Sequence, residues 1–198
     1  MVSFDKGKGH FNYRVAGVVV HNDRVLLDRN TRNKYWVLPG GHPDMMESMA
    51  AALKREMYEE IGADVEVIRL LWIMENFYYR EKPIHELSFY FLMHLDPSSV
   101  LLRSDGPFYG EEGNSQLIFQ WHPINETSLC NLPLYPSYLA SALLNMPSTP
   151  LHIVFDDSAQ SHSQRTAQDA PNRENSAVPV RVKPIPTGEG DLGIYNKG

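Results

Sequence analysis

The segment from Leu38 to Val65, LPGGHPDMMESMAAALKREMYEEIGADV, constrains the fold more than any other part of the chain. Ser48 is a suitable N-cap and Gly62 a suitable stop, so the segment predicts a helix from about Ser48 to Ile61. One stripe of this helix is apolar and is expected to face a core; it consists of Ala50, Leu53, Met57 and Ile61. The helix must therefore pack against other parts of the chain.

Three glutamates, Glu56, Glu59 and Glu60, crowd into the end of that helix. Each carboxylate there opposes the helix dipole by roughly 0.3–1 kcal/mol, and like charges four residues apart cost roughly 0.2–0.5 kcal/mol more. A solvated acidic face is the usual explanation of such a run, but these energies disfavour it. A divalent cation would turn the repulsion into coordination, and carboxylate oxygens suit Mg²⁺ or Mn²⁺. Such sites recur where a metal steadies phosphate oxygens and activates water.

Alternating and continuous apolar runs predict strands on both sides of this helix. Their ranges are Tyr13–His21, Arg24–Asp28, Tyr35–Leu38, Asp64–Leu71, Glu86–Leu95, Gln116–Trp121 and Leu151–Phe155, with a second helix near Pro136–Asn145. A short polar turn joins the first two strands and predicts a hairpin. The strands surround two helices in mixed order, without regular βαβ alternation, so the expected fold is α+β or a mixed-sheet sandwich.

The composition changes after Phe155. Residues 157–198 are first polar and then rich in Pro and Gly, and are predicted to form a flexible tail that cannot offset its ordering entropy by burial. Residues 1–156 are predicted to be the folded domain. An alternative stays open, in which VPVRV within the tail adds a strand to the domain or to a partner.

The formal net charge of -6 argues against a general binder of nucleic acid or of anionic membranes, because those use extended basic surfaces. It is compatible with a small anionic ligand held through a metal. Cys130 is the only cysteine and cannot form an internal disulfide, so the cytoplasm is the simplest compartment. The N-terminus has no apolar signal core, and no segment approaches the roughly 18 apolar residues of a membrane span.

The spacing within the acidic segment resembles the signature of the Nudix hydrolase family: Gly, five residues, Glu, seven residues, Arg-Glu, apolar, any, Glu-Glu, any, Gly, apolar. In this chain the positions are Gly41, Glu47, Arg55, Glu56, Met57, Glu59, Glu60, Gly62 and Ala63. Ala63 is smaller than the usual residue, and Met46 stands where the family often has Gly. The resemblance covers roughly residues 10–155. It implies the Nudix fold, a mixed sheet sandwiched between helices, and hydrolysis of a nucleoside diphosphate linked to another group.

The resemblance also implies a metal centre. Glu56 and Glu60 would be metal ligands, and Glu59 would be a further ligand or would hold metal-bound water. The Gly40 carbonyl would face the metal. The expected cofactor is Mg²⁺, with Mn²⁺ as a substitute.

Two further residues of the signature would act on the cluster. Arg55 would pair with Glu47 and orient the carboxylates, because a guanidinium forks onto carboxylate oxygens. Water made nucleophilic by the metal and a base would then attack phosphorus.

The base varies in this family and often lies outside the signature. Glu112, in the loop YGEEGNSQ, is the candidate, although an acidic surface loop explains it equally well. Glu111 and Glu86 are held in reserve.

Substrate contacts are expected from a second set of residues. Arg29 follows the second strand, where MutT-like members often place a phosphate-binding arginine, and Arg14 is an alternative. Gly41 in the signature loop and Tyr79 are the remaining candidates. Tyr79 loosely resembles a tyrosine used by diadenosine-polyphosphate hydrolases.

The expected function is therefore metal-dependent hydrolysis of the pyrophosphate linkage in a nucleotide, ADP-ribose, a dinucleoside polyphosphate or a nucleotide sugar. The alternative is a non-catalytic Nudix module that binds a nucleotide or a protein, although such relatives usually lose signature carboxylates. A structural Ca²⁺ site fits less well, because the acidic residues lie on a helix and not in an Asp- and Asn-rich loop. The expected partner is a small molecule, with no nucleic acid and no membrane. The oligomeric state stays open, with a homodimer as one outcome.

Overall fold

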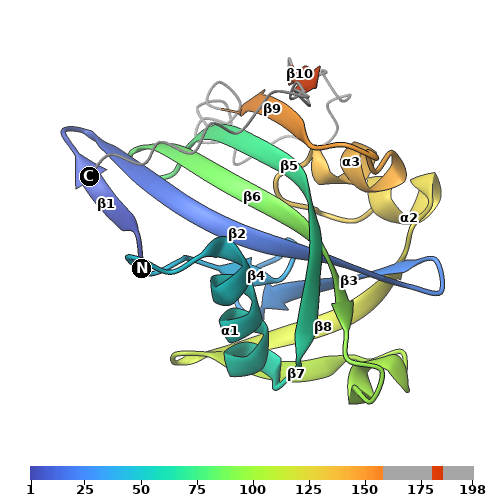
Figure 1. Ribbon diagram of the computed structural model, residues 1–198. Coiled ribbons are helices and arrows are strands. Elements are labelled where there is room, and N and C mark those ends of the chain that lie inside the picture. The colour runs from blue at the N-terminus through green and yellow to red at the C-terminus, as the bar shows by residue number, and fades with distance from the viewer. Residues whose placement is uncertain (158–179, 185–198) are drawn as a thin grey trace, which may run out of the picture.

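A mixed β-sheet with helices on both faces organises the protein (Figure 1). The computed structural model describes residues 1–157 and 180–184. The strands are β1 Ser3–Lys6, β2 Gly9–His21, β3 Arg24–Asn30, β4 Gly40–Gly41, β5 Val65–Tyr79, β6 Pro83–Leu95, β7 Phe108–Glu112, β8 Ser115–Pro123, β9 Leu151–Asp156 and β10 Val180–Pro184. The helices are α1 Met49–Ile61, α2 Glu126–Cys130 and α3 Leu139–Leu144, with a 3₁₀ turn, η1, at Val100–Leu102.

The strands follow the order β10-β9-β5-β6-β2-β3-β8-β7, while β1 and β4 pair with β2. The β2–β6 and β5–β9 ladders are parallel, and the remaining ladders are antiparallel. Strand β2 pairs with β6 from His10 to Val19, but with β3 only through Val20 and His21. The β3–β8–β7 part therefore diverges from the rest of the sheet and leaves room between the two parts.

Alternating side chains along β2 contribute to two separate cores. Val15 and Val19 pack on the α1 side, with Leu53 and Met57 of the helix. Ala16 and Val18 pack on the opposite side, in a cluster that includes Leu129, Leu139 and Leu143 from α2 and α3. Because both faces are covered by helices, the predicted α+β sandwich is confirmed.

The predicted hairpin is present between β2 and β3, with Asn22 and Asp23 at φ 50° and 55° in its turn. The predicted strand at Tyr35–Leu38 is wrong. This segment makes only single bridges, from Trp36 to Leu134 and from Val37 to Asp28. Two neighbours each offer it one pairing position, so no ladder forms along it.

Part of the predicted tail is ordered as strand β10, which pairs antiparallel with β9. It overlaps the VPVRV sequence that the alternative reading placed in a strand. Residues 158–179 and 185–198 lie outside the described residues, so the prediction of a flexible tail there is not addressed. Among the described residues, none of the helices has the length and apolar character that crossing a bilayer requires.

Candidate active site

Helix α1 begins and ends as predicted. The Ser48 side chain accepts a hydrogen bond from the Ala51 amide at 3.3 Å, and Gly62 adopts a left-handed conformation with φ 65°. The buried residues of the helix are Ala52, Leu53, Met57 and Glu60. The predicted apolar stripe is confirmed at Leu53, Met57 and Ile61, which pack in or against the core on this side of the sheet. It is wrong at Ala50, which is only partly buried and lies outside that cluster, and it misses the buried glutamate Glu60.

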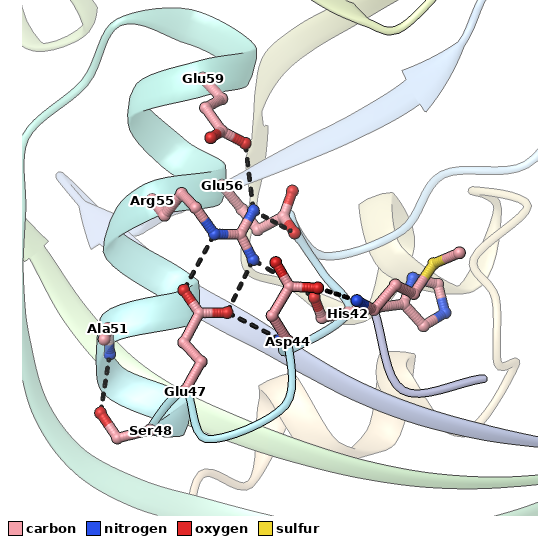
Figure 2. A network of polar contacts seen from close by, with 9 residues as sticks. His42, Asp44, Glu47, Ser48, Ala51, Arg55, Glu56 and Glu59 are labelled. Carbon is pink, nitrogen blue, oxygen red and sulfur yellow. Dashed lines mark hydrogen bonds and ion pairs between the residues drawn. The ribbon is translucent and has the colours of Figure 1, made fainter.

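Arg55 connects the acidic residues of the helix to the loop before it (Figure 2). Its Nε and Nη2 atoms donate to the two carboxylate oxygens of Glu47, both at 2.9 Å. Its Nη1 atom donates to Glu56 and Glu59, both at 3.0 Å, and Nη2 also donates to the His42 carbonyl at 3.3 Å. The hydrogen bond from Arg55 lowers the pKa of Glu47, and in return Glu47 is the main cause of a raised pKa of Arg55. The predicted Arg55–Glu47 pair is present.

Two glycines allow close packing around this network. A Cβ at Gly40 would lie 2.3 Å from the Val15 carbonyl oxygen, and Gly40 has φ 142°. A Cβ at Gly41 would lie 2.3 Å from the Glu56 carboxylate. Gly40 thus lets the loop approach β2, while Gly41 leaves the space that Glu56 occupies.

Met46 has a left-handed backbone conformation, which glycine adopts more easily than other residues. It adopts φ 66°, and its side chain is fully exposed. The loop can therefore follow its path with a non-glycine residue, at the strain that a left-handed conformation imposes.

A cavity of about 270 Å³ opens beside the C-terminal end of α1. Nine elements contribute to its wall, together with the loops that flank them: β2 to β8, α1 and α3. The polar and aromatic residues that line it include Asn12, Arg14, Asp28, Asn30, His42, Glu60, Tyr78, Arg80, Glu86, Glu112 and Tyr135.

Three carboxylates from three elements face one end of this cavity: Asp28 from β3, Glu60 from α1 and Glu112 from β7. Glu60 is 6% exposed and Asp28 is 7% exposed. The Glu60 Oε2 and Asp28 Oδ1 atoms are buried without a hydrogen-bond partner among the described residues. Burial and the negative charge of Asp28 raise the pKa of Glu60 to about 9. Burial also raises the pKa of Asp28 to about 7, against the opposing effect of Arg14. The structure thus brings the candidate base, Glu112, together with the signature carboxylate Glu60.

Arg14 provides positive charge in this cavity. Its Nη2 atom donates to the Leu38 carbonyl at 3.3 Å. Burial disfavours its charged form, but Glu86 and Asp28 outweigh burial and raise the pKa of Arg14. A guanidinium between carboxylates is well placed for phosphate oxygens.

The structure does not bring the candidate substrate residues Arg29, Gly41 and Tyr79 into the cavity lining. Arg29 donates to the Asn33 carbonyl at 3.3 Å and lies 5.1 Å from the centre of the Trp36 ring. Successive residues of a strand point to opposite faces, so Asp28 lines the cavity and Arg29 does not. For the same reason Tyr78 lines the cavity and Tyr79 does not.

The other end of the cavity is polar and aromatic. Glu86 is buried and accepts hydrogen bonds from Ser88 at 3.0 Å and from Asn12 and Tyr78 at 3.3 Å. The rings of Tyr78 and Tyr135 lie 5.6 Å apart at this end. Glu86, a reserve candidate for the base, thus lies with the aromatic residues. Glu111 does not line the cavity among the described residues.

Comparison with known proteins identifies the family. The sequence matches the NUDIX domain over residues 12–139, so the chain belongs to the Nudix family. Among similar proteins, the 8-oxo-dGTP diphosphatase of Buchnera aphidicola subsp. Schizaphis graminum is 24% identical over 136 residues, covering 67% of this chain and 92% of that protein. The RNA pyrophosphohydrolase of Ruthia magnifica subsp. Calyptogena magnifica is 29% identical over 138 residues, covering 63% and 77%.

The fold is also found in solved structures. The mutator MutT protein from Bacillus halodurans superposes with a TM-score of 0.55 at 21% identity, covering 88% of this chain and 99% of that chain. This likeness confirms the predicted Nudix fold.

The cavity residues fit the divalent metal that the family implies. Their carboxylates are the hard oxygen donors that Mg²⁺ and Mn²⁺ prefer, and two of them keep a buried oxygen without a partner. Glu56 and Glu59 are hydrogen-bonded to Arg55. Within residues 1–157 and 180–184, no three acidic, histidine or cysteine side chains are already grouped as metal ligands. Mg²⁺ usually takes one or two carboxylates and completes its shell with water and substrate phosphates, so a pair is sufficient.

Proposed function

We propose that this chain hydrolyses the pyrophosphate linkage of a nucleoside diphosphate derivative with the help of a divalent cation. The chain is a Nudix-type pyrophosphohydrolase: the family match spans residues 12–139, and similar proteins are named as a diphosphatase and a pyrophosphohydrolase. The observation that carries the proposal is the buried pair Glu60 and Asp28, whose unpartnered oxygens line the same cavity as Arg14.

The metal would be held by Glu60, Glu56 and the Gly40 carbonyl, with Glu59 at the exposed rim as a further ligand or as a holder of water. When bound, the cation would offset the charge of the diphosphate and lower the pKa of bound water. Mg²⁺ is the proposed ion, with Mn²⁺ as a substitute.

The remaining residues of the site position groups and move a proton. Arg55 fixes Glu47 and the signature loop, so Gly40 and Gly41 keep their places next to β2 and Glu56. Arg14 binds phosphate oxygens. Glu112 accepts a proton from the attacking water while the water oxygen bonds to one phosphorus of the diphosphate. The bridging P–O bond breaks, and the other phosphate group leaves with the bridging oxygen and the bonding electrons.

The polar and aromatic end of the cavity would hold the nucleoside. The Tyr78 and Tyr135 rings offer apolar faces, and Glu86 offers an anionic hydrogen-bond acceptor. The substrate class remains a nucleotide, ADP-ribose, a dinucleoside polyphosphate or a nucleotide sugar. Arg29 and Tyr79 would influence binding only from outside the cavity lining.

Three other expectations stand as proposals beside this function. Residues 1–156 are proposed to form the catalytic domain and residues 157–198 a tail. The single Cys130 supports a cytoplasmic enzyme. A homodimer stays open as the oligomeric state.

A substrate panel tests the function. The full chain is incubated with nucleoside triphosphates, ADP-ribose, diadenosine polyphosphates and nucleotide sugars, with Mg²⁺, Mn²⁺ or EDTA, and released phosphates are identified. We expect turnover with either metal and none with EDTA. Glu60→Gln should reduce turnover at least about 100-fold, because metal coordination contributes several kcal/mol to such reactions. Glu111→Gln is the matched control, since this neighbour of Glu112 does not line the cavity among the described residues, and it should behave like the wild type.

The panel also decides between the two readings of the family. Turnover of every substrate no higher than that of Glu60→Gln would overturn the proposal. Nucleotide binding without any turnover would support the non-catalytic module instead.

A further inference from the structure

Asp28 is a buried carboxylate that lies outside the signature segment. On one side its backbone pairs with Val37: its amide donates to the Val37 carbonyl at 3.0 Å, and its carbonyl accepts from the Val37 amide at 2.9 Å. On the other side Asp28 pairs with Phe119 in the β3–β8 ladder. Its side chain is 7% exposed and lines the cavity. The strand therefore aims this carboxylate into the site.

The surroundings of Asp28 do not neutralise it fully. One of its oxygens, Oδ1, is buried without a hydrogen-bond partner among the described residues. The Arg14 guanidinium offsets part of the negative charge of Asp28. It also interacts electrostatically with Glu86 and Glu60, and it donates a hydrogen bond to the Leu38 carbonyl. A buried negative charge that is only partly offset destabilises the fold. It becomes favourable when the carboxylate binds a further cation or a proton.

Glu60 lines the same cavity and is also an incompletely compensated carboxylate. It is 6% exposed, and its Oε2 atom is buried without a partner among the described residues. Both carboxylates line the same cavity, and among the charged neighbours Asp28 contributes most to the raised pKa of Glu60. Two buried carboxylates in one cavity, each with a spare oxygen, are a ligand pair for one hard cation.

We propose that Asp28 is a ligand of a divalent cation in this cavity, which it shares with Glu60. Glu56 and the Gly40 carbonyl would keep the positions proposed for them above. Water and substrate phosphate oxygens would fill the rest, as is usual for Mg²⁺. Asp28 thereby extends the metal site from helix α1 across the cavity to strand β3. The inference rests on the site of the proposed function, but its test does not depend on turnover.

The experiment measures Mn²⁺ binding to the full chain by isothermal titration calorimetry, without nucleotide. Asp28→Asn keeps the shape of the side chain and removes its charge. We expect it to weaken Mn²⁺ binding at least about tenfold, because loss of even an outer-shell partner of a metal ligand typically costs about 10–100-fold in affinity. Glu111→Gln is the matched control and should bind Mn²⁺ like the wild type.

Thermal unfolding with and without Mn²⁺ provides the second readout. Metal-free Asp28→Asn should be at least as stable as the wild type, because a buried charge has gone, and Mn²⁺ should raise its Tm less. Asp28→Ala is titrated in parallel, so a folding defect of one variant does not hide the result.

Wild-type affinity for Mn²⁺ in both Asp28 variants would overturn the inference. The same holds if Asp28→Asn binds Mn²⁺ normally but loses nucleotide affinity, since Asp28 would then be a substrate contact. A wild-type chain that binds Mn²⁺ through Asp28 but hydrolyses nothing would contradict only the proposed function.

Discussion

At the scale of single residues, the burial of Glu60 explains most of the electrostatics of the site. The helix places this glutamate where an apolar residue would complete its buried stripe, and β3 adds Asp28 beside it. Arg14 balances only part of the resulting charge. The folded protein therefore favours protons or cations at these two carboxylates.

This arrangement predicts how stability depends on pH. The pKa values of Glu60, about 9, and Asp28, about 7, lie above their ordinary values of 4.5 and 3.8. Between the ordinary and the raised values the folded state binds more protons than the unfolded state, so stability falls as pH rises. Urea unfolding in EDTA should show a midpoint that declines from pH 5 to pH 9.

Glu60→Gln is the control for this decline, because its amide does not titrate. It should flatten the slope and stabilise the metal-free protein at high pH. An equally steep decline in Glu60→Gln would assign the pH dependence to other groups.

The neighbouring glycines Gly40 and Gly41 predict different consequences of the same substitution. In Gly41→Ala the new methyl group meets the movable carboxylate of Glu56, so stability should change by less than about 1 kcal/mol while turnover falls. In Gly40→Ala it meets the backbone of β2 at positive φ, so the Tm should drop clearly. Unfolding curves and turnover of both variants check this contrast, and full activity of Gly41→Ala would contradict it.

At the scale of elements, the sequence predicts what depends on local pattern and misses what depends on neighbours. Helix α1 and its caps follow from Ser48, Gly62 and the spacing of Leu53 and Met57. Strand β7, FYGEE, is not predicted, because a glycine and two glutamates follow its two aromatic residues and its stability comes from pairing with β8.

The site shows the same division between local and non-local information. Signature spacing was enough to predict the Arg55–Glu47 pair. The sequence favours Arg29 over Arg14 and indicates Tyr79, because it does not show which face of a strand borders a cavity. No motif or spacing in the sequence marks Asp28 as a site residue. It is recognised only in the structure, where it lines the same cavity as Glu60.

The loop before α1 predicts a stabilising substitution. Met46 has φ 66°, a conformation that costs a non-glycine residue roughly 1–2 kcal/mol. Met46→Gly should raise the Tm slightly, after the entropy cost of glycine, roughly 0.5–1 kcal/mol, is subtracted. Met45→Gly is the matched control, because Met45 is also exposed but is not at positive φ, and it should not raise the Tm. Equal effects of both substitutions would contradict the role of strain.

At the scale of the whole molecule, the divergence of two sheet parts from β2 creates the cavity. The residues that line it all lie between Asn12 and Leu139, within the family match. Strand β10 is the edge strand at the end of the sheet away from β7, and it pairs with β9.

A chain that ends at Asp157 should therefore retain turnover close to that of the full chain. It should be less stable and aggregate more readily, because the β9 edge loses its partner. Turnover and light scattering on heating check this expectation. Loss of turnover in a folded, truncated chain would show that later residues contribute to the site.

The parallel β2–β6 ladder has a consequence for how the protein folds. The Asn12–Glu86 hydrogen bond in the cavity joins residues 74 positions apart, whereas the β2–β3 hairpin closes over a two-residue turn. Contacts of such long range form only after the entropy of closing a large loop has been offset, and parallel pairing is slow for this reason. An incompletely folded chain can thus already contain the hairpin and the acidic helix. The cavity is assembled afterwards, when β6 docks on β2.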